Sequence, residues 1–404
     1  MEVVRKKIGN IDYWPIYWKD PYTHALIIGK SGGGKSALMA NWWREDHFSP
    51  NAKILIEPSG FLAREALSIS RGQAIYCSLD TPVSINPMHI PYNPNTISDL
   101  IAEAINQVIT VTTGGSLKQM TPKMRNILDT AIKYCLEHNR KSLVHVRDYI
   151  ANLRGEGETR DGILARINFL INDERMREII CGNDSVKWGE LIQKGQTFIL
   201  DCFGMSKEKM VFAGTLVSHG LKNYFRHERP AKYRPVSIYI DECHLYVNST
   251  FMDVLKEGRK YKLSCVMATQ DFASIDDRLV RVMLNVGTLI AFRVGHREAQ
   301  LIANEMGKIK EDEVEHGWDG SNYTKKTVTF DTKEILQNLA NYHLAYMTPR
   351  EKGIANAPRP PFARKIEPKR PEPKRTLQGK WFPLESYQPE TSPRDSGGLS
   401  CGSL

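Results

Sequence analysis

Residues 24–36 read His-Ala-Leu-Ile-Ile-Gly-Lys-Ser-Gly-Gly-Gly-Lys-Ser. The first part is an apolar run typical of a buried strand, and the second fits G-x-x-x-x-G-K-[ST], the pattern of a phosphate-binding loop that opens a helix. Glycines let the backbone turn tightly and direct its N–H groups at an anion, and the positive end of the following helix adds to the attraction. This stretch therefore predicts a strand at 25–28, a phosphate-binding loop at 29–36 and a helix at 37–44.

The loop residues have separate expected roles in binding a nucleoside triphosphate. Lys35 is placed to reach the β- and γ-phosphates, and the Ser36 hydroxyl is placed to bind Mg²⁺. The predicted cofactors are therefore ATP and Mg²⁺. The phosphate-binding residues are expected to be Gly29, Lys30, Ser31, Gly32, Gly33, Gly34, Lys35 and Ser36.

The composition is that of an ordinary globular protein. The 404 residues are 41% hydrophobic and 25% charged, which is typical of a soluble protein with two or three structural units. No apolar run approaches the length of about 18 residues that a membrane span needs, and the start, Met-Glu-Val-Val-Arg-Lys-Lys, has no hydrophobic signal region. We therefore expect a cytoplasmic protein that is not integral to a membrane; docking to a membrane channel would use a partner or the C-terminal tail, or would not occur.

Charge and cysteine spacing narrow the choice of partners and cofactors. The formal net charge of +9 favours a polyanionic partner such as nucleic acid. The alternative is that some of the excess positive charge only solvates the C-terminal segment. The 7 cysteines lie far apart and form no C-x-x-C pair. We expect them to be reduced core residues of a cytosolic protein rather than disulfide partners or metal ligands.

Strand-like and helix-like segments alternate along most of the chain, which predicts an α/β fold with a mostly parallel sheet covered on both faces. Strands are expected at 25–28, 53–57, 197–201, 236–240, 263–269, 288–292 and 343–347. Between 96 and 195 the pattern changes to that of amphipathic helices, and these are expected at 97–111, 122–137, 143–153 and 162–171. Thr121 followed by Pro122 is a strong helix start, since it combines an N-cap residue with proline at the first helical position.

These segments divide the chain into four expected parts. A short β-hairpin (3–7 with 13–18) and the first part of an ATPase core occupy 1–95. An inserted all-α subdomain follows at 96–195, and the second part of the core at 196–350. Residues 351–404 are rich in Pro, Lys and Arg and are expected to form a disordered tail, because such a composition cannot bury a core.

A triphosphate site also needs carboxylates, which the loop does not supply. The apolar run 236–240 leads into Asp241-Glu242, so both carboxylates are expected at the end of a buried strand. Asp241 is predicted to hold Mg²⁺, and Glu242 is predicted to be the general base that polarises the attacking water. The adjacent pair indicates hydrolysis rather than phosphoryl transfer to a metabolite.

Two more polar residues follow the acidic pair. Gln270 follows the apolar strand 263–269, where its amide would contact the γ-phosphate and the water; the alternative is an ordinary strand-end cap. Arg259, in Gly-Arg-Lys-Tyr at 258–261, is expected on the helix that leaves the Asp-Glu strand. We interpret Arg259 as a candidate arginine finger, which neutralises charge in the transition state; the alternative is a solvated helix end. If it acts on a neighbouring subunit, hydrolysis requires a ring.

In combination these motifs resemble those of the HerA/FtsK superfamily of ring-forming, DNA-pumping ATPases. The closest match is to the type IV secretion and conjugation branch, which includes the TraG-like coupling proteins. The resemblance extends from about 25 to 347 and rests on Gly-Lys-Ser-Gly-Gly-Gly-Lys-Ser (29–36), Ile-Asp-Glu-Cys-His (240–244), Glu-Gly-Arg-Lys-Tyr (257–261) and Ala-Thr-Gln (268–270).

The resemblance implies a RecA-like P-loop core, a homohexameric ring, ATP hydrolysis at subunit boundaries and DNA moving through a central channel. It also implies a protein partner such as a secretion channel or a relaxase. The chain departs from the family because its first 28 residues leave no room for N-terminal membrane helices or a β-barrel. The implied site residues are Lys35 and Ser36 for phosphate and Mg²⁺, Asp241 and Glu242 as the Walker-B pair, Gln270 as the sensor and Arg259 as the trans-acting arginine.

Three functions fit these motifs. The leading hypothesis is an ATP-driven DNA translocase that serves conjugation or another mobile-element transfer step. Its backbone contacts to DNA are expected from Lys and Arg side chains of the helical insertion and of the segment around Lys207 and Lys209. The second hypothesis is a viral genome-packaging motor with the same core. The third is a scaffold ATPase whose nucleotide state controls a protein partner.

Overall fold

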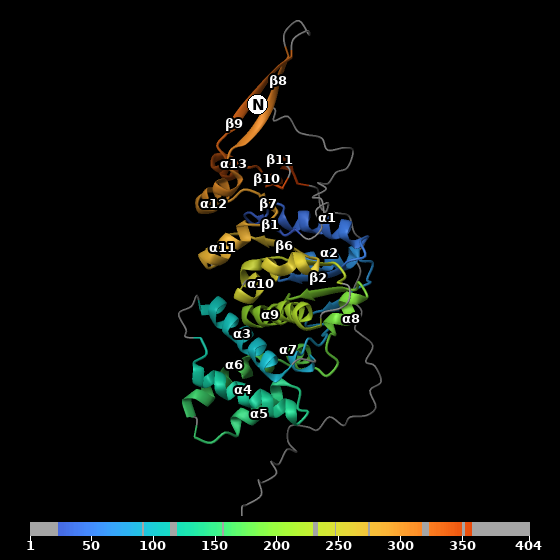
Figure 1. Cartoon of the computed structure of the whole chain (residues 1–404), viewed down its shortest axis with the longest axis vertical. Helices are drawn as coiled ribbons and strands as arrows, with labels where there is room; N and C mark the ends of the chain where they lie inside the picture. Colours follow the sequence, from blue (N-terminus) through green and yellow to red (C-terminus); the bar gives the residue numbers. More distant parts are fainter. Residues whose placement is uncertain are drawn as a thin grey trace, which may run out of the picture. The chain divides into compact units, whose positions relative to one another are not determined.

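A nine-stranded sheet organises the described part of the chain (Figure 1). The strand order is β11-β10-β7-β1-β6-β5-β2-β4-β3; neighbours are parallel from β7 to β3, whereas β10 and β11 run antiparallel at one edge. The computed structural model describes residues 23–90, 93–113, 119–155, 157–228, 233–246, 248–273, 275–316, 323–349 and 352–357. The strands of the sheet are β1 (Ala25–Ile28), β2 (Ala52–Glu57), β3 (Ile75–Cys77), β4 (Thr197–Asp201), β5 (Val236–Ile240), β6 (Leu263–Thr269), β7 (Thr288–Ala291), β10 (His343–Met347) and β11 (Lys352–Asn356).

The parallel register brings several strand ends to one edge of the sheet. Ile28 of β1 pairs with Thr269 of β6 and with Ala291 of β7, and Ile240 of β5 pairs with Met267 of β6. The segments that follow β1, β5 and β6 therefore leave the sheet at the same carboxyl edge. In open α/β sheets this edge is where ligands bind.

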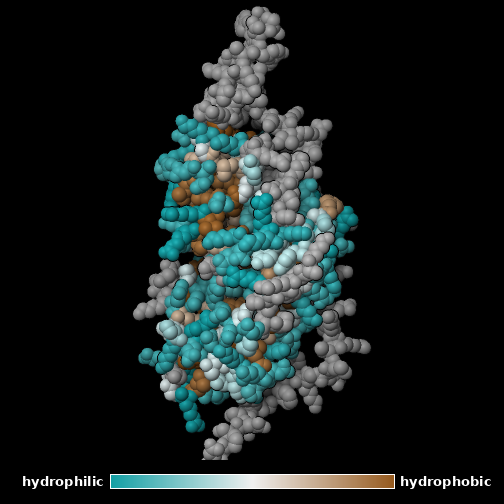
Figure 2. Space-filling view, in the orientation of Figure 1, coloured by the Kyte–Doolittle hydropathy of each residue, from teal (hydrophilic) through white to brown (hydrophobic). Residues whose placement is uncertain are grey.

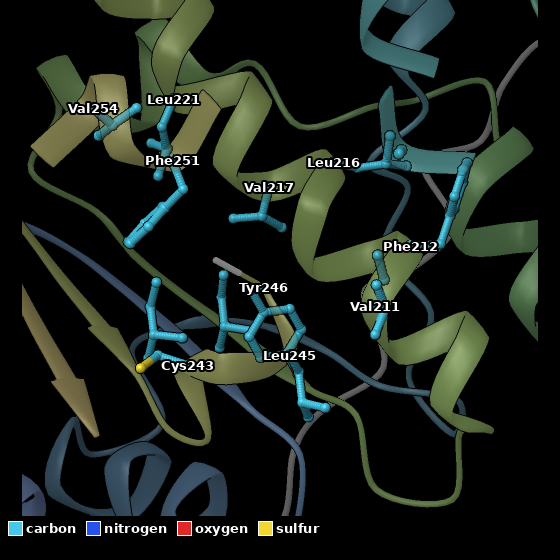
Figure 3. Packing of buried hydrophobic residues seen from close by; sticks show 14 of the residues in the cluster. Val211, Phe212, Leu216, Val217, Leu221, Cys243, Leu245, Tyr246, Phe251 and Val254 are labelled. Atoms are coloured by element: carbon cyan, nitrogen blue, oxygen red, sulfur yellow. The ribbon is translucent and has the colours of Figure 1, made fainter. Parts of the chain in front are cut away.

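Helices cover both faces of the sheet because successive strand residues point to opposite sides. Ala25 and Ile27 share a core with α1 (Lys35–His47) and α2 (Phe61–Ile69). Leu26 and Ile28 belong to the opposite core, part of which Figure 3 shows where side chains of α9 and α10 meet those of the turn after β5. The helices that contribute to this second core include α9 (Lys207–Asn223), α10 (Ser249–Glu257), α11 (Asp277–Leu284) and α12 (His296–Met306).

A run of helices is inserted between the adjacent parallel strands β3 and β4. The first of them packs along α9; Figure 1 shows α4, α5 and α6 beyond it, whereas α8 lies beside α9. Thr121 caps α4, since its hydroxyl accepts a hydrogen bond from the Met124 amide, and Pro122 occupies the first turn. The inserted helices are α3 (Pro94–Thr113), α4 (Pro122–Glu137), α5 (Leu143–Ala151), α6 (Gly157–Ile171), α7 (Glu174–Cys181) and α8 (Trp188–Gln193).

The remaining elements lie near the antiparallel edge. The strands β8 (Ile309–His316) and β9 (Tyr323–Phe330) pair as an antiparallel hairpin, and α13 (Thr332–Asn338) leads to β10. Figure 2 shows a mostly hydrophilic face, with a hydrophobic area between the positions of α11 and α12 in Figure 1. Among the helices of the described ranges, none combines the length and the apolar character that a membrane span requires.

Most of the predicted strands are confirmed. Those at 25–28, 197–201, 236–240, 263–269 and 343–347 have the predicted bounds, and β2 and β7 differ from their predictions by one residue at one end. The prediction of a tail from residue 351 is wrong at its start, because 352–356 forms β11 by pairing with the free edge of β10. The predicted hairpin at 3–7 and 13–18 lies outside the described residues. The prediction missed the strands β3, β8, β9 and β11 and, within the insertion, the helices α7 and α8.

Candidate active site

The phosphate-binding loop connects β1 to α1 at the carboxyl edge of the sheet. The Gly29 amide donates to the Thr269 carbonyl at 3.2 Å, and the Lys30 amide donates to the Arg293 carbonyl at 2.9 Å. Thr269 is the last residue of β6, and Arg293 lies just after the end of β7. These two strands are the neighbours of β1 in the sheet. The start of the loop is therefore fixed to both adjacent strand ends.

Two glycines of the loop are required by its geometry. A Cβ atom on Gly29 would lie 2.6 Å from Cβ of Phe292, which is too close for any side chain. Gly34, the N-cap of α1, has a φ of 116°, a backbone conformation that other residues rarely adopt. The backbone conformation of the predicted loop is thus consistent with its glycine pattern.

Lys35 points into the loop. Its side chain is only 6% exposed, and Nζ donates to the carbonyl oxygens of Gly29 at 2.8 Å and Lys30 at 3.4 Å. Burial lowers the pKa of Lys35, while the charges of Glu242 and Asp241 act to raise it. The structure therefore places a buried ammonium group between the loop and the two carboxylates.

Ser36 and Asp241 meet, although 205 positions separate them in the sequence. The Ser36 hydroxyl lies 3.4 Å from Oδ2 of Asp241, the residue after β5. Burial raises the pKa of Asp241 to about 6, with smaller contributions from the charges of Glu242 and Glu57. The two oxygens fit a Mg²⁺ ion, which usually binds one or two protein oxygens and completes its shell with water and phosphate. No group of three or more His, Cys, Asp or Glu side chains suited to a metal occurs within the described ranges.

Glu242 follows Asp241 in a left-handed backbone conformation, with a φ of 46°. Its Oε1 accepts a hydrogen bond of 2.6 Å from Nε2 of Gln270, and its Oε2 lies 3.3 Å from Nδ1 of His244. Burial acts to raise the pKa of Glu242, but the contacts with His244, Gln270 and Lys35 outweigh it and lower the pKa. The carboxylate is therefore ionised near neutral pH, as a general base must be.

His244 is a site residue that the sequence interpretation missed. Nδ1 also lies 3.3 Å from Oγ1 of Thr269, and that hydroxyl donates its own hydrogen to the Asp271 carbonyl. Because the hydroxyl proton is used, Thr269 must accept from His244, which places the imidazole proton on Nδ1. The signal in the sequence was a histidine two residues after the predicted base.

Arg259 lies elsewhere. It occupies the 3-10 turn η4 (Gly258–Tyr261), which directly continues α10, the helix that leaves the Asp-Glu strand, and precedes β6. It is therefore near the amino edge of the sheet, whereas the phosphate-binding loop is at the carboxyl edge. The structure does not bring Arg259, an exposed residue, to the site of its own chain.

His24 holds the turn that carries Arg259. Its Nδ1 accepts from the Cys265 amide at 3.1 Å, so the imidazole proton is on Nε2, which donates to the Leu255 carbonyl at 2.8 Å. Leu255 is in the last turn of α10, where carbonyl groups lack helical partners. A Cβ on Gly258 would come within 3.0 Å of the His24 ring, which explains the glycine before Arg259.

Comparison with known proteins supports the fold. No protein-family description matches the chain, and no curated protein matches it by sequence. Its structure is similar to that of the bacterial conjugative coupling protein TrwBdeltaN70, with a TM-score of 0.61 and 14% identity over 87% of this chain and 86% of that one. TrwB in complex with ADP and Mg²⁺ has a TM-score of 0.61 and 13% identity over 85% of this chain and 87% of that one. VirB4 of Thermoanaerobacter pseudethanolicus has a TM-score of 0.60 and 13% identity over 83% and 88% of the two chains. The RecA-like P-loop fold predicted from the sequence is thus confirmed.

Proposed function

We propose that this chain is a ring-forming, ATP-driven DNA translocase of a conjugation, type IV secretion or other mobile-element DNA transfer system. The observation that carries the proposal is the convergence of Ser36, on the phosphate-binding loop, with Asp241 at the end of β5. Fold similarity to a conjugative coupling protein and to VirB4 supports the choice of system.

The residues of the site can each be given a role in ATP hydrolysis. Lys35 and the loop amides would bind the phosphates, and Ser36 and Asp241 would hold Mg²⁺, which would supply positive charge against that of the phosphates. Glu242 takes a proton from the attacking water, and Gln270 orients this base through the hydrogen bond of 2.6 Å. Bound ATP would supply the transferable phosphoryl group.

The position of Arg259 supports a ring. An arginine near the amino edge of the sheet lies away from the triphosphate site of its own chain, and we propose that it serves the site of a neighbour. A closed ring places one such arginine at every boundary, and we propose a homohexamer. Trans-acting arginines of this kind stabilise transition-state charge and raise rates by orders of magnitude.

DNA is the proposed substrate because the formal net charge of +9 suits a polyanion gripped by its backbone. The protein is proposed to be cytoplasmic and to reach a membrane channel, or a relaxase, through protein contacts. A viral genome-packaging motor would also need ATP hydrolysis, a ring and contacts with the DNA backbone, so it is the alternative function within the class of DNA pumps.

The deciding experiment measures ATP turnover with and without linear duplex DNA, together with the mass of the assembled species. A translocase predicts a hexamer and turnover that rises severalfold with DNA. Turnover that ignores DNA in an intact ring would instead favour a nucleotide-switched scaffold with a protein partner. A Lys35→Ala preparation gives the background rate, which should be the same with and without DNA.

A further inference from the structure

Tyr342 lies against the phosphate-binding loop from the far end of the chain. It occupies the turn between α13 and β10, and its amide donates to the Gly33 carbonyl at 3.1 Å. A Cβ on Gly34 would come within 3.1 Å of Cδ1 of its ring. Nevertheless 49% of Tyr342 is exposed. The ring therefore borders the loop with much of its surface open.

The backbone of Tyr342 is held in an unfavourable conformation. Its φ is 62°, in the left-handed region where a bulky non-glycine residue is uncommon and strained. Two hydrogen bonds keep it there, because its carbonyl also accepts from the Ala357 amide, just after β11, at 2.7 Å. Strain of this kind is concentrated at ligand-binding sites, where it fixes the position of a side chain.

Strand order determines which end of a nucleotide Tyr342 would meet. Asp241, which is proposed to hold Mg²⁺, and Gln270, which is proposed to orient the base, follow β5 and β6 on one side of β1, and this is the side where the γ-phosphate would be cleaved. On the other side of β1 the sheet continues with β7 and then β10, which begins directly after Tyr342. A triphosphate that crosses the loop with its γ end toward β5 directs its nucleoside toward β7 and β10.

We propose that Tyr342 is the platform on which the nucleobase of the bound triphosphate stacks. The proposal rests on the proposed nucleotide site and adds a base subsite to it. Stacking on one aromatic face accepts any nucleobase, because every base has a π surface. Losing such a contact lowers affinity by on the order of 5- to 100-fold, with little discrimination between adenine and guanine.

The test separates the base from the phosphates. The full-length chain and its variants are titrated by calorimetry, in the presence of Mg²⁺, with a non-hydrolysable ATP analogue, the corresponding GTP analogue and inorganic tripolyphosphate. Tyr342→Gly removes the ring and suits the positive φ, Tyr342→Phe keeps the ring, and Phe48→Ala removes another exposed aromatic, at the C-terminal end of α1.

We expect Tyr342→Gly to bind both nucleotide analogues about tenfold more weakly and tripolyphosphate as the parent does. Tyr342→Phe and Phe48→Ala should match the parent with all three ligands. Unchanged nucleotide affinity in Tyr342→Gly would overturn the proposal. An equal loss of affinity for tripolyphosphate in Tyr342→Gly would also overturn it, because the ring would then only shape the loop. A loss of nucleotide affinity in Tyr342→Phe equal to that in Tyr342→Gly would overturn it as well. A parent protein that binds none of the three ligands would refute the nucleotide site itself.

Discussion

Gln270 and Glu242 join the ends of two neighbouring strands, since Nε2 of Gln270 donates to Oε1 of Glu242 at 2.6 Å. Oε2 of Glu242 lies 3.3 Å from Nδ1 of His244 without a hydrogen bond of good geometry among the described residues, so one carboxylate oxygen is held by a side chain and the other is left to accept from water. A base held in this way has few rotamers to lose when water arrives, which favours proton transfer from a fixed direction.

Replacing Glu242 with Gln removes the proton acceptor and keeps the size of the side chain. We expect kcat to fall by about 10²- to 10⁴-fold, whereas nucleotide affinity should change little because the phosphate-binding loop is untouched. Phosphate release and binding of a fluorescent ATP analogue measure the two effects. Glu305→Gln, on the exposed face of α12, is the matched control. Turnover at the parent rate would remove Glu242 from the role of base.

Replacing Lys35 with Met tests whether its buried charge serves function or stability. Burial of an ammonium group costs free energy, so the change should not lower the melting temperature, although it removes the hydrogen bonds to Gly29 and Lys30. We expect ATP turnover to be lost because the buried ammonium group of the loop is gone. Scanning fluorimetry and an ATPase assay provide the two readouts, with exposed Lys308→Met as control. Retained turnover would mean that the phosphate-binding loop is wrongly assigned.

The core strands and the two nucleotide motifs could be predicted because their signals are local. An apolar run that ends in glycine or in an acidic pair identifies both a strand and its function. The missed strands lack such a signal. β3 is only three residues long, β8 reads Ile-Lys-Glu-Asp-Glu-Val-Glu-His, and β11 is made by the free edge of β10 rather than by its own sequence. Pairing with a neighbour decides such segments, which strand propensity alone does not reveal.

The missed site residues share a different cause. Tyr342 contacts the loop only because β10 returns antiparallel beside β7, and the role of His24 depends on the lateral order of β1 and β6. Strand order is a property of the whole fold and cannot be inferred from the local sequence around these residues. Arg259 lies on the 3-10 continuation of the predicted helix, and the pattern of the sequence did not reveal this change from α to 3-10 geometry.

Acid should destabilise the fold through a buried histidine of α9. His219 of α9 is buried, with Nε2 3.5 Å from Oε2 of Glu103 in α3, and burial lowers its pKa to about 4. In the unfolded chain the pKa is near its ordinary value of about 6.5. The unfolded state therefore binds more protons between these values, and the stabilising effect of a neutral His219 is lost as the pH falls through this window.

We expect the His219 contribution to the free energy of unfolding to fall by about 1 kcal/mol between pH 7.5 and pH 5.5. Urea unfolding at the two pH values measures this loss. The His219→Gln variant cannot titrate at this position, so its loss of stability between the two pH values should be smaller than that of the parent by this amount. The exposed-site variant His138→Gln should lose as much stability as the parent. Equal pH dependence in the parent and in His219→Gln would contradict the assignment.

His24 should control the mobility of the Arg259 turn. Asn at position 24 keeps an acceptor for the Cys265 amide but is too short to reach the Leu255 carbonyl, while Gln provides a donor with longer reach. We expect His24→Asn to speed amide hydrogen exchange over 255–262 and to cost about 1 kcal/mol of stability, with partial rescue by His24→Gln. His138→Asn is the control. Exchange that is unchanged in His24→Asn would show that other contacts hold the turn.

A mixing experiment tests whether Arg259 acts across a subunit boundary. Arg259→Ala subunits keep an intact site but cannot supply the arginine, whereas Glu242→Gln subunits supply the arginine but lack the base. Each preparation alone should be nearly inactive. In mixed rings, an Arg259→Ala site beside a Glu242→Gln neighbour has every group it needs, so turnover should rise to a maximum at intermediate ratios. A donor that carries Glu242→Gln and His24→Asn together should restore less, because its arginine turn is loosened. If Arg259 only solvates a helix end, Arg259→Ala alone stays active and mixing merely averages the two rates.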